Sequence, residues 1–322
     1  MIPITSAGRM VARNSVEVPV ARRAPAQQRA TAGTRHIAVF VDGSPEAANA
    51  AWRGALVARD RGLPLHLIVL HPLHADLAEA ASTADSLASE VRGKLDLQVS
   101  SQAIAGTREH EGVEATRDAS LLVLPSAARR GPWPPGSPVL RMLRRARRPV
   151  LLARTPAQMS YRRVLAAVEL DLDACSLIAA ARALSRDPCM KVLHVLDTSH
   201  EETMRLADVP ERVIHSQRER DALRARGVLA DLIASAGGRD DAEPAIAFGN
   251  AEQAVVEQQL ATGADLLVVG KRPRHALVDA LRGGVAQRVL RSAAADVLVL
   301  PMQPRAPTAS WLLPDFARLP AQ

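Results

Sequence analysis

The chain carries the same order of strand and helix signals twice. One copy opens with "HIAVFVDGSPEAANAAW" from His36, and the other opens with "RVLAAVELDLDACSLIA" from Arg163. Each begins with an apolar, β-branched run, continues with an acidic residue (Asp42 or Glu169) and then shows helical spacing of apolar residues. The offset between the copies stays constant across this block, which predicts a duplicated unit.

The later parts of the two copies match as well. "ASLLVLP" at 119–125 corresponds to "ADLLVVG" at 264–270. "GSPVLRMLRRARRPVLLAR" at 136–154 then aligns without a gap with "GGVAQRVLRSAAADVLVLP" at 283–301. The repeated unit has the size of an ordinary domain. After its second strand, the second copy has a longer stretch than the first copy.

The duplication divides the chain into four segments. We expect a disordered basic tail at 1–34, a first domain at 35–155, a second domain at 160–302 and a C-terminal tail at 303–322. The C-terminal tail holds Trp311 and Phe316, in a chain with few aromatic residues. These side chains either dock on the folded body or bind a partner.

Continuous apolar strands define the fold class. Strands without polar alternation are typical of a parallel sheet that is buried on both faces. Alternation of such strands with helices predicts a doubly wound α/β fold in each copy. Folds of this kind bind ligands outside the carboxyl ends of their strands, where we expect Asp42, Pro125, Glu169 and Gly270.

These pieces resemble the universal stress protein family. The resemblance rests on "VDGS" at 41–44, "ADLLVVG" at 264–270 and "GGVAQRVLRSAAADVLVLP" at 283–301, and it covers both copies. It implies two flavodoxin-like, adenine-nucleotide alpha hydrolase-like domains in tandem. It also implies that the domains pack as an intramolecular pseudo-dimer through the strands at 150–153 and 297–300, with a homodimer as a further option.

In the family, a glycine pattern G-x-x-G, nine residues, then G-[ST] holds the phosphates of an adenine nucleotide, and the acid after the first strand seats the adenosine. In the second copy, Pro273 stands where the second glycine belongs, and Gly284 replaces the Ser/Thr. In the first copy, Pro125 and Ala128 replace both glycines of the loop. Since proline removes an N–H donor, these departures predict weak or vestigial binding of ATP with Mg²⁺, favoured in the second copy. The candidate nucleotide-binding residues are Val168, Glu169, Gly270, Lys271, Arg272, Gly283, Gly284 and Val285 in the second copy, and Asp42, Ser44, Gly136 and Ser137 in the first.

No catalytic or metal-binding constellation stands out in the sequence. His66, His71 and His74 have no cysteine near them, and neither copy has the G-x-S-x-G elbow of a hydrolase. We therefore expect a stress-associated binding or signalling module rather than an enzyme. Slow ATP hydrolysis in one copy is the enzymatic alternative.

The net charge of +7 raises the alternative of a nucleic-acid binder. Much of the excess lies in the first 35 residues, and a second basic run spans Arg141–Arg148. Aromatic side chains for stacking are absent from both, so a solvated helix face is the favoured interpretation of Arg141–Arg148. Two cysteines, Cys175 and Cys189, are too few for a disulfide framework, and no apolar run is long enough to span a membrane. These features predict a soluble protein of the cytoplasm.

Overall fold

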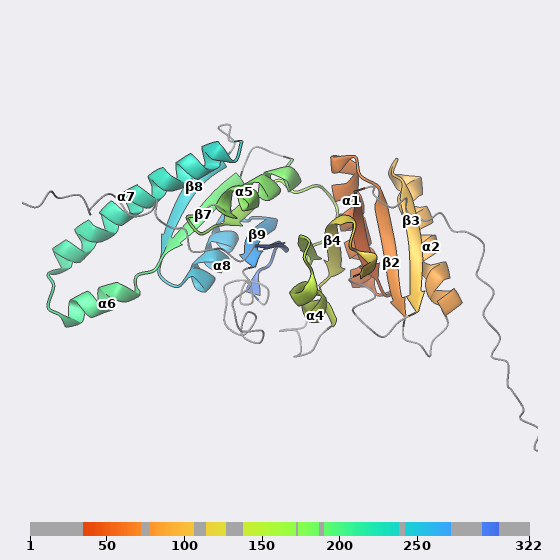
Figure 1. Cartoon of the computed structure of the whole chain (residues 1–322), viewed down its shortest axis with the longest axis horizontal. Helices are drawn as coiled ribbons and strands as arrows, with labels where there is room; N and C mark the ends of the chain where they lie inside the picture. Colours follow the sequence, from red (N-terminus) through yellow and green to blue (C-terminus); the bar gives the residue numbers. More distant parts are fainter. Residues whose placement is uncertain are drawn as a thin grey trace, which may run out of the picture.

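The computed structural model describes residues 35–71, 77–105, 114–126, 138–171, 173–186, 190–237, 242–271 and 292–302. These residues form one ten-stranded sheet with helices on both of its faces (Figure 1). The predicted mostly parallel α/β fold is confirmed.

The sheet is built from two sets of five strands. The first set comprises β1 His36–Val41, β2 Leu65–His71, β3 Val99–Ala105, β4 Ala119–Pro125 and β5 Val150–Ala153. The second set comprises β6 Val164–Ala167, β7 Met190–Leu196, β8 Ala242–Phe248, β9 Leu266–Lys271 and β10 Asp296–Pro301. The order across the sheet is β3-β2-β1-β4-β5-β10-β9-β6-β7-β8, so both sets have the same order when read inward from their own edge. All neighbouring strands are parallel except β5 and β10, which pair antiparallel where the sets meet.

Helices cover both faces of each set. The first set carries α1 Pro45–Arg61, α2 Leu77–Lys94 and α4 Pro138–Arg145; the second carries α5 Asp173–Leu184, α6 Ser199–Leu206, α7 Glu211–Ser235 and α8 Ala251–Thr262. Buried side chains place α1, α2, α5 and α7 on one face of the sheet and α4 and α8 on the other. Each of the two apolar layers contains residues from both sets, so the core runs through the β5–β10 boundary without a break.

Local sequence signals explain where the helices begin and end. Ser44 caps α1 by accepting a hydrogen bond from the amide of Ala47 at 3.1 Å, and Pro45 occupies the first turn. Gly62 ends α1 in the left-handed region with φ of 62°. In the basic run Arg141–Arg148, α4 ends at Arg145. Pro149 has no N–H to donate to the carbonyl of Arg145 and disfavours helical backbone at Arg148, so the helix does not continue through the run.

Buried polar side chains hold the segment that connects the two sets. We call the group formed by Asp296, Arg53 and Tyr161 the clamp. The carboxylate of Asp296, fully buried at the start of β10, pairs with the Arg53 guanidinium of α1 at 2.8 Å. It also accepts hydrogen bonds from the amides of Arg154 and Thr155, both at 2.7 Å, and from the Tyr161 hydroxyl at 2.6 Å. Arg53 in turn donates to the carbonyl of Met159 at 2.7 Å. The connecting segment is therefore held from both sets of strands.

The longer stretch of the second copy forms a helical arm. Helices α6 and α7 extend beyond the sheet at the left of Figure 1. The buried carboxylate of Glu201 in α6 accepts from Arg218 Nε of α7 at 2.8 Å and pairs with Arg205 at 3.4 Å. Hydrogen bonding and charge from Arg218, with Arg205 nearby, lower the pKa of Glu201. The contact between Glu201 and Arg218 therefore joins α6 to α7.

Candidate functional site

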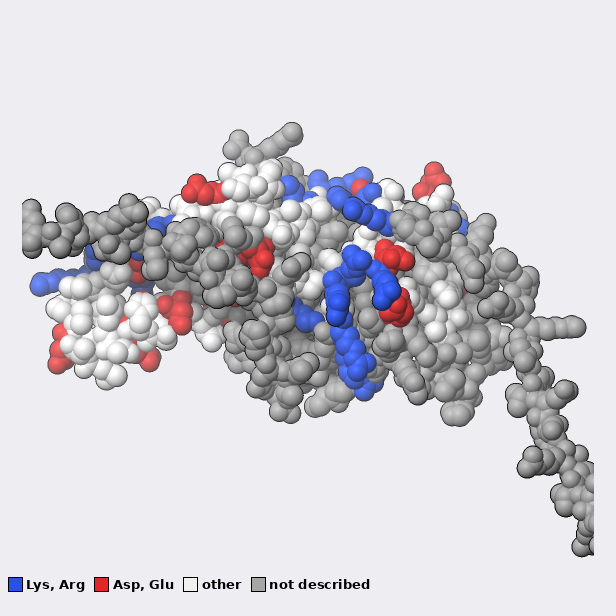
Figure 2. Space-filling model, in the orientation of Figure 1, with Lys and Arg blue, Asp and Glu red and all other residues white. Residues whose placement is uncertain are grey.

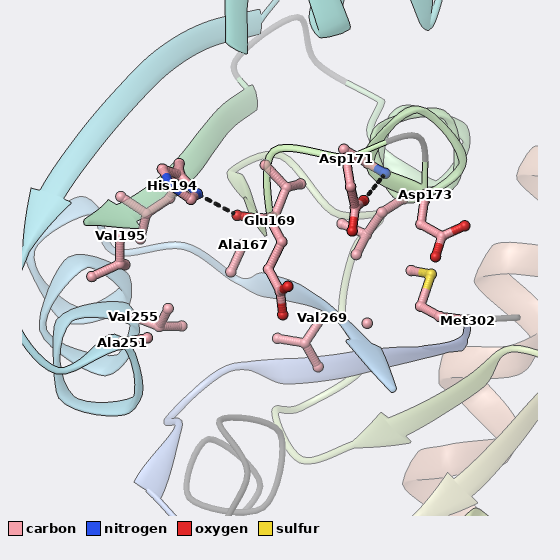
Figure 3. Close-up of a pocket in the computed structure, with 15 residues that line it drawn as sticks. Ala167, Glu169, Asp171, Asp173, His194, Val195, Ala251, Val255, Val269 and Met302 are labelled. Carbon is pink, nitrogen blue, oxygen red and sulfur yellow. Dashed lines mark hydrogen bonds between the residues drawn. The ribbon is translucent and has the colours of Figure 1, made fainter. Parts of the chain in front are cut away.

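A pocket opens at the carboxyl ends of the second set of strands. Its volume is about 120 Å³. Strands β6, β7 and β9, the start of α5 and the start of α8 contribute its walls (Figure 3). The lining residues are Ala167, Val168, Glu169, Asp171, Asp173, Ala174, Leu177, Leu193, His194, Val195, Ala251, Val255, Val269, Gly270 and Met302. The structure thus brings together three predicted residues, namely Val168, Glu169 and Gly270.

Glu169 reaches the pocket because β6 ends two residues before it. The amide of Val168 still bonds to the carbonyl of Leu193 at 2.9 Å, and the chain then turns, with the amide of Asp171 bonding to the carbonyl of Glu169 at 2.8 Å. In Figure 3 the side chain of Glu169 extends toward Val269 of β9. A carboxylate in this position can accept hydrogen bonds from the hydroxyl groups of a ligand.

Asp171 has a structural task at the start of α5. Its carboxylate accepts from the amide of Ala174 at 3.2 Å, in the manner of an N-cap (Figure 3). Together with Glu169 and Asp173 it makes the described part of the pocket lining acidic. Each of these carboxylates disfavours an anionic ligand group placed directly against it.

His194 forms one side of the pocket and contacts the backbone of Val168. Its Nδ1 lies 3.0 Å from the carbonyl oxygen of Val168 (Figure 3). Because a carbonyl can only accept, Nδ1 carries the hydrogen in this contact. The carbonyl of Val168 is consequently occupied by the protein's own side chain.

Gly270 leaves space for two neighbouring side chains inside the pocket. A Cβ atom at this position would lie 2.9 Å from Cε of Met302 and 3.3 Å from Cδ1 of Leu177. The absent side chain therefore leaves room for Met302 and Leu177, in addition to any role toward a ligand.

Lys271 follows Gly270 but does not line the pocket. Its ammonium donates to the carbonyl of Leu143, in the last turn of α4, at 2.7 Å. A cation there interacts favourably with the carbonyl end of the helix dipole. Contact with a phosphate would require Lys271 to leave α4. The predicted residues Arg272, Gly283, Gly284 and Val285 lie outside the described residues.

The corresponding part of the first set is organised differently. Asp42 Oδ1 accepts from both the amide and the hydroxyl of Ser44, at 3.0 Å and 2.5 Å, so both predicted residues take part in starting α1. Asp42 and Ser44 border a hollow of about 970 Å³ between the beginning of α1 and one side of α2. Glu79 and Glu90 of α2 also line this hollow. Gly136 and Ser137 lie outside the described residues.

The basic run near α4 lies beside acidic side chains. Figure 2 shows a band of lysine and arginine side chains in the middle of this face with acidic side chains next to it. Arg117 pairs with Glu114 at 3.2 Å, and Arg148 donates to the carbonyl of Arg117 at 3.2 Å. Because α4 ends at Arg145, Arg148 makes its contact from beyond the helix, and only Arg141–Arg145 of the basic run belong to a helix face.

Sequence reasoning missed several residues of the pocket. The signal for Asp171 was present, since the duplication aligns it with the helix cap Ser44. The positions of His194, Ala251, Val255 and Met302 depend on how distant strands pair, which no local pattern states. Within the described ranges, no group of three His, Cys, Asp or Glu residues could hold a metal ion. Every helix in those ranges is also too short or too polar to cross a membrane.

Comparison with known proteins identifies a family for the second part of the chain. Residues 160–301 match the model of the universal stress protein family. A protein of unknown function from Pseudomonas aeruginosa PAO1 is 24% identical, covering 83% of this chain and 92% of its own, with a TM-score of 0.59. A universal stress protein from Archaeoglobus fulgidus DSM 4304 is 16% identical, covering 83% of this chain and 98% of its own, with a TM-score of 0.62. No curated protein matches the chain. The two solved structures show that the fold extends over most of the chain, and residues 160–301 form a universal stress protein domain.

Proposed function

We propose that the second domain binds an adenine nucleotide weakly at its pocket and that the protein acts as a stress-associated binding or signalling module in the cytoplasm. The observation that carries this proposal is the meeting of Val168, Glu169 and Gly270 at the carboxyl edge of a universal stress protein domain. Ligands of doubly wound folds bind at such an edge.

The chemistry of the pocket suits a nucleoside better than it suits phosphates. Val168, Val255 and Val269 offer apolar surface for a base, and Glu169 offers acceptors for ribose hydroxyls. The carboxylates of Asp171 and Asp173 oppose phosphate groups, so Mg²⁺ would accompany a triphosphate. Weak binding follows from this balance.

We also propose that the first set of strands is a second universal stress protein domain, so that the chain is a tandem pair. The identical strand order and the matched helix starts at Ser44 and Asp171 support this interpretation. Antiparallel pairing of β5 with β10 joins the two domains into an intramolecular pseudo-dimer. In this arrangement the first domain serves mainly as a structural partner.

Calorimetric titration with Mg–ATP tests the nucleotide proposal. Ala251→Trp places a large side chain at the pocket of the second domain, and Ala48→Trp does the same at the hollow of the first domain. We expect a stoichiometry near one for the unaltered protein, loss of binding in Ala251→Trp and no change in Ala48→Trp. No heat at millimolar nucleotide, or loss of binding only in Ala48→Trp, would contradict the proposal.

A further inference from the structure

The pocket of the second domain lies where the described chain ends. Met302, the last described residue, lines the pocket itself. Its amide bonds to the carbonyl of Lys271 at 2.8 Å, which holds Met302 beside the end of β9. Twenty residues, 303–322, follow from this point. The segment is therefore joined to the fold at a residue that lines the pocket.

The sequence of this segment complements the pocket. Trp311, Leu312, Leu313 and Phe316 give it a short, strongly apolar cluster. Most of the pocket wall is apolar as well, with Leu177, Val195 and Val255 among its side chains. Aromatic side chains bury large apolar areas, so such a cluster gains most from a partly apolar recess close at hand.

The charged side chains of the segment also complement those of the pocket. The segment contains Arg305 and Arg318 against Asp315, whereas the described pocket lining contains Glu169, Asp171 and Asp173. Arginine side chains are accommodated beside carboxylates more readily than a phosphate group is. Tethering also raises the effective concentration of the segment at the pocket far above that of a free ligand.

We propose that residues 303–322 dock at the pocket of the second domain, with Trp311 and Phe316 as anchors against its apolar wall. The segment and a small ligand then compete for the same surface. Docking itself does not require that the protein binds a nucleotide; only the competition rests on the proposed function.

Hydrogen exchange on the full-length chain tests the docking directly. A variant with Trp311→Ser, Leu312→Ser, Leu313→Ser and Phe316→Ser removes the apolar cluster and leaves the length unchanged. We expect severalfold faster amide exchange at 167–171, 193–195 and 251–255, the segments that line the pocket. Exchange at 41–44 and 82–87, which border the hollow of the first domain, should stay the same.

The control variant changes the same segment without touching its apolar residues. Thr308→Ala with Ser310→Ala should exchange like the unaltered protein at every segment. Equal exchange in the four-serine variant and the unaltered protein would overturn the proposal, and so would a change confined to the first domain. Such a change would indicate that the segment docks elsewhere.

The same variants separate docking from nucleotide binding. If both hold, the four-serine variant binds Mg–ATP more tightly than the unaltered protein in the calorimetric titration. If exchange changes as expected but neither protein binds nucleotide, docking stands and the nucleotide proposal fails. If nucleotide binds equally to both and exchange does not change, the nucleotide proposal stands and docking fails.

Discussion

The first half of the molecule is the set β1–β5 with its helices, and the second half is the set β6–β10 with its helices. The first helix of each half begins at a matching position, but a different side chain caps it: Ser44 precedes α1 and Asp171 precedes α5. Both side chains accept a hydrogen bond from the amide three residues further on. The acid of the first half, Asp42, supports its neighbour Ser44, whereas Glu169 of the second half extends into the pocket. An acidic residue at the end of a strand is therefore not by itself a ligand-binding residue, because helix initiation uses the same chemistry.

The two halves also differ in how they meet. In the matched segments Asp296 corresponds to Pro149, and Arg53 corresponds to Ala180. The ion pair between Arg53 and Asp296 therefore has no counterpart on the other side of the β5–β10 boundary. The strand pairing at this boundary is nearly symmetric, but the buried ion pair occurs on one side of it and not at the matching positions of the other side.

The largest effect is expected from breaking this one-sided clamp. Asp296→Ala leaves the guanidinium of Arg53 buried without its ion-pair partner and removes the acceptor of Tyr161. Removal of one partner from a buried pair costs about 3–5 kcal/mol of the free energy of unfolding. Urea unfolding measures this loss.

A matched control comes from the exposed pair of the second half. Lys191 and Glu243 lie 3.4 Å apart on β7 and β8; the side chain of Glu243 is exposed and that of Lys191 is partly exposed. Glu243→Ala should cost less than about 1 kcal/mol. If Asp296→Ala cost as little, the clamp would contribute nothing and the two halves would be held by their apolar layers alone.

A smaller effect is expected at the contact of the first helix with the sheet. Gly54 in α1 corresponds to Ala181 in α5, and both positions are buried. A Cβ atom at Gly54 would lie 2.5 Å from Cγ2 of Val39, so α1 packs too closely on β1 to accept it. Gly54→Ala should destabilise the fold by about 1–3 kcal/mol despite the better helix propensity of alanine.

Thermal unfolding of Gly54→Ala checks the close approach of α1. Ala181→Gly tests the same level of the second half, where the loss should be only about 1 kcal/mol, mostly from helix propensity. A stabilised Gly54→Ala variant would show that α1 can move away from β1 at no cost, which would contradict the packing described here.

The helix caps give the next effect and sharpen the comparison of the two halves. Ser44→Ala and Asp171→Ala should each lower the free energy of unfolding by about 1 kcal/mol, because each leaves one amide of a first turn without its acceptor. Chemical unfolding measures both variants. If Asp171→Ala kept full stability but lost Mg–ATP binding, its carboxylate would be a ligand group rather than a cap.

Much of the fold could be predicted because its signals are local. Apolar runs such as 121–124 and 266–269 identify buried parallel strands, and Ser44 with Pro45 identifies the start of α1. The duplicated order then gives the α/β architecture. These signals need no knowledge of which distant segments touch.

The site was less predictable because its contacts join distant segments. The sequence marks Lys271 as a charge beside a glycine, but not that its ammonium bonds to Leu143 in α4. Likewise, His194 lies at the pocket because β7 pairs with β6 in one particular register. Side-chain contacts of this kind arise from tertiary packing, which periodicity and spacing do not encode.

The smallest change in the free energy of unfolding is expected when the pH is lowered, and it should arise from a histidine of the first half. His66 of β2 is buried, with Nδ1 2.8 Å from Oγ of Ser100, and the matching residue of β7 is the charged Lys191. Burial, with a further contribution from His36 and an opposing hydrogen bond from Gln102, lowers the pKa of His66 below 6.5. The unfolded chain therefore takes up a proton at a higher pH than the folded one.

This difference fixes the sign of the pH dependence. The contribution of His66 to stability is fully present above pH 6.5, the ordinary value, and is lost as the pH falls through the lower pKa of the folded state. We expect the free energy of unfolding to fall between pH 7 and pH 5, and His66→Gln to flatten this slope. Chemical unfolding at stepped pH measures both proteins. An equally steep slope in His66→Gln would assign the acid sensitivity to other groups and remove this difference between the halves.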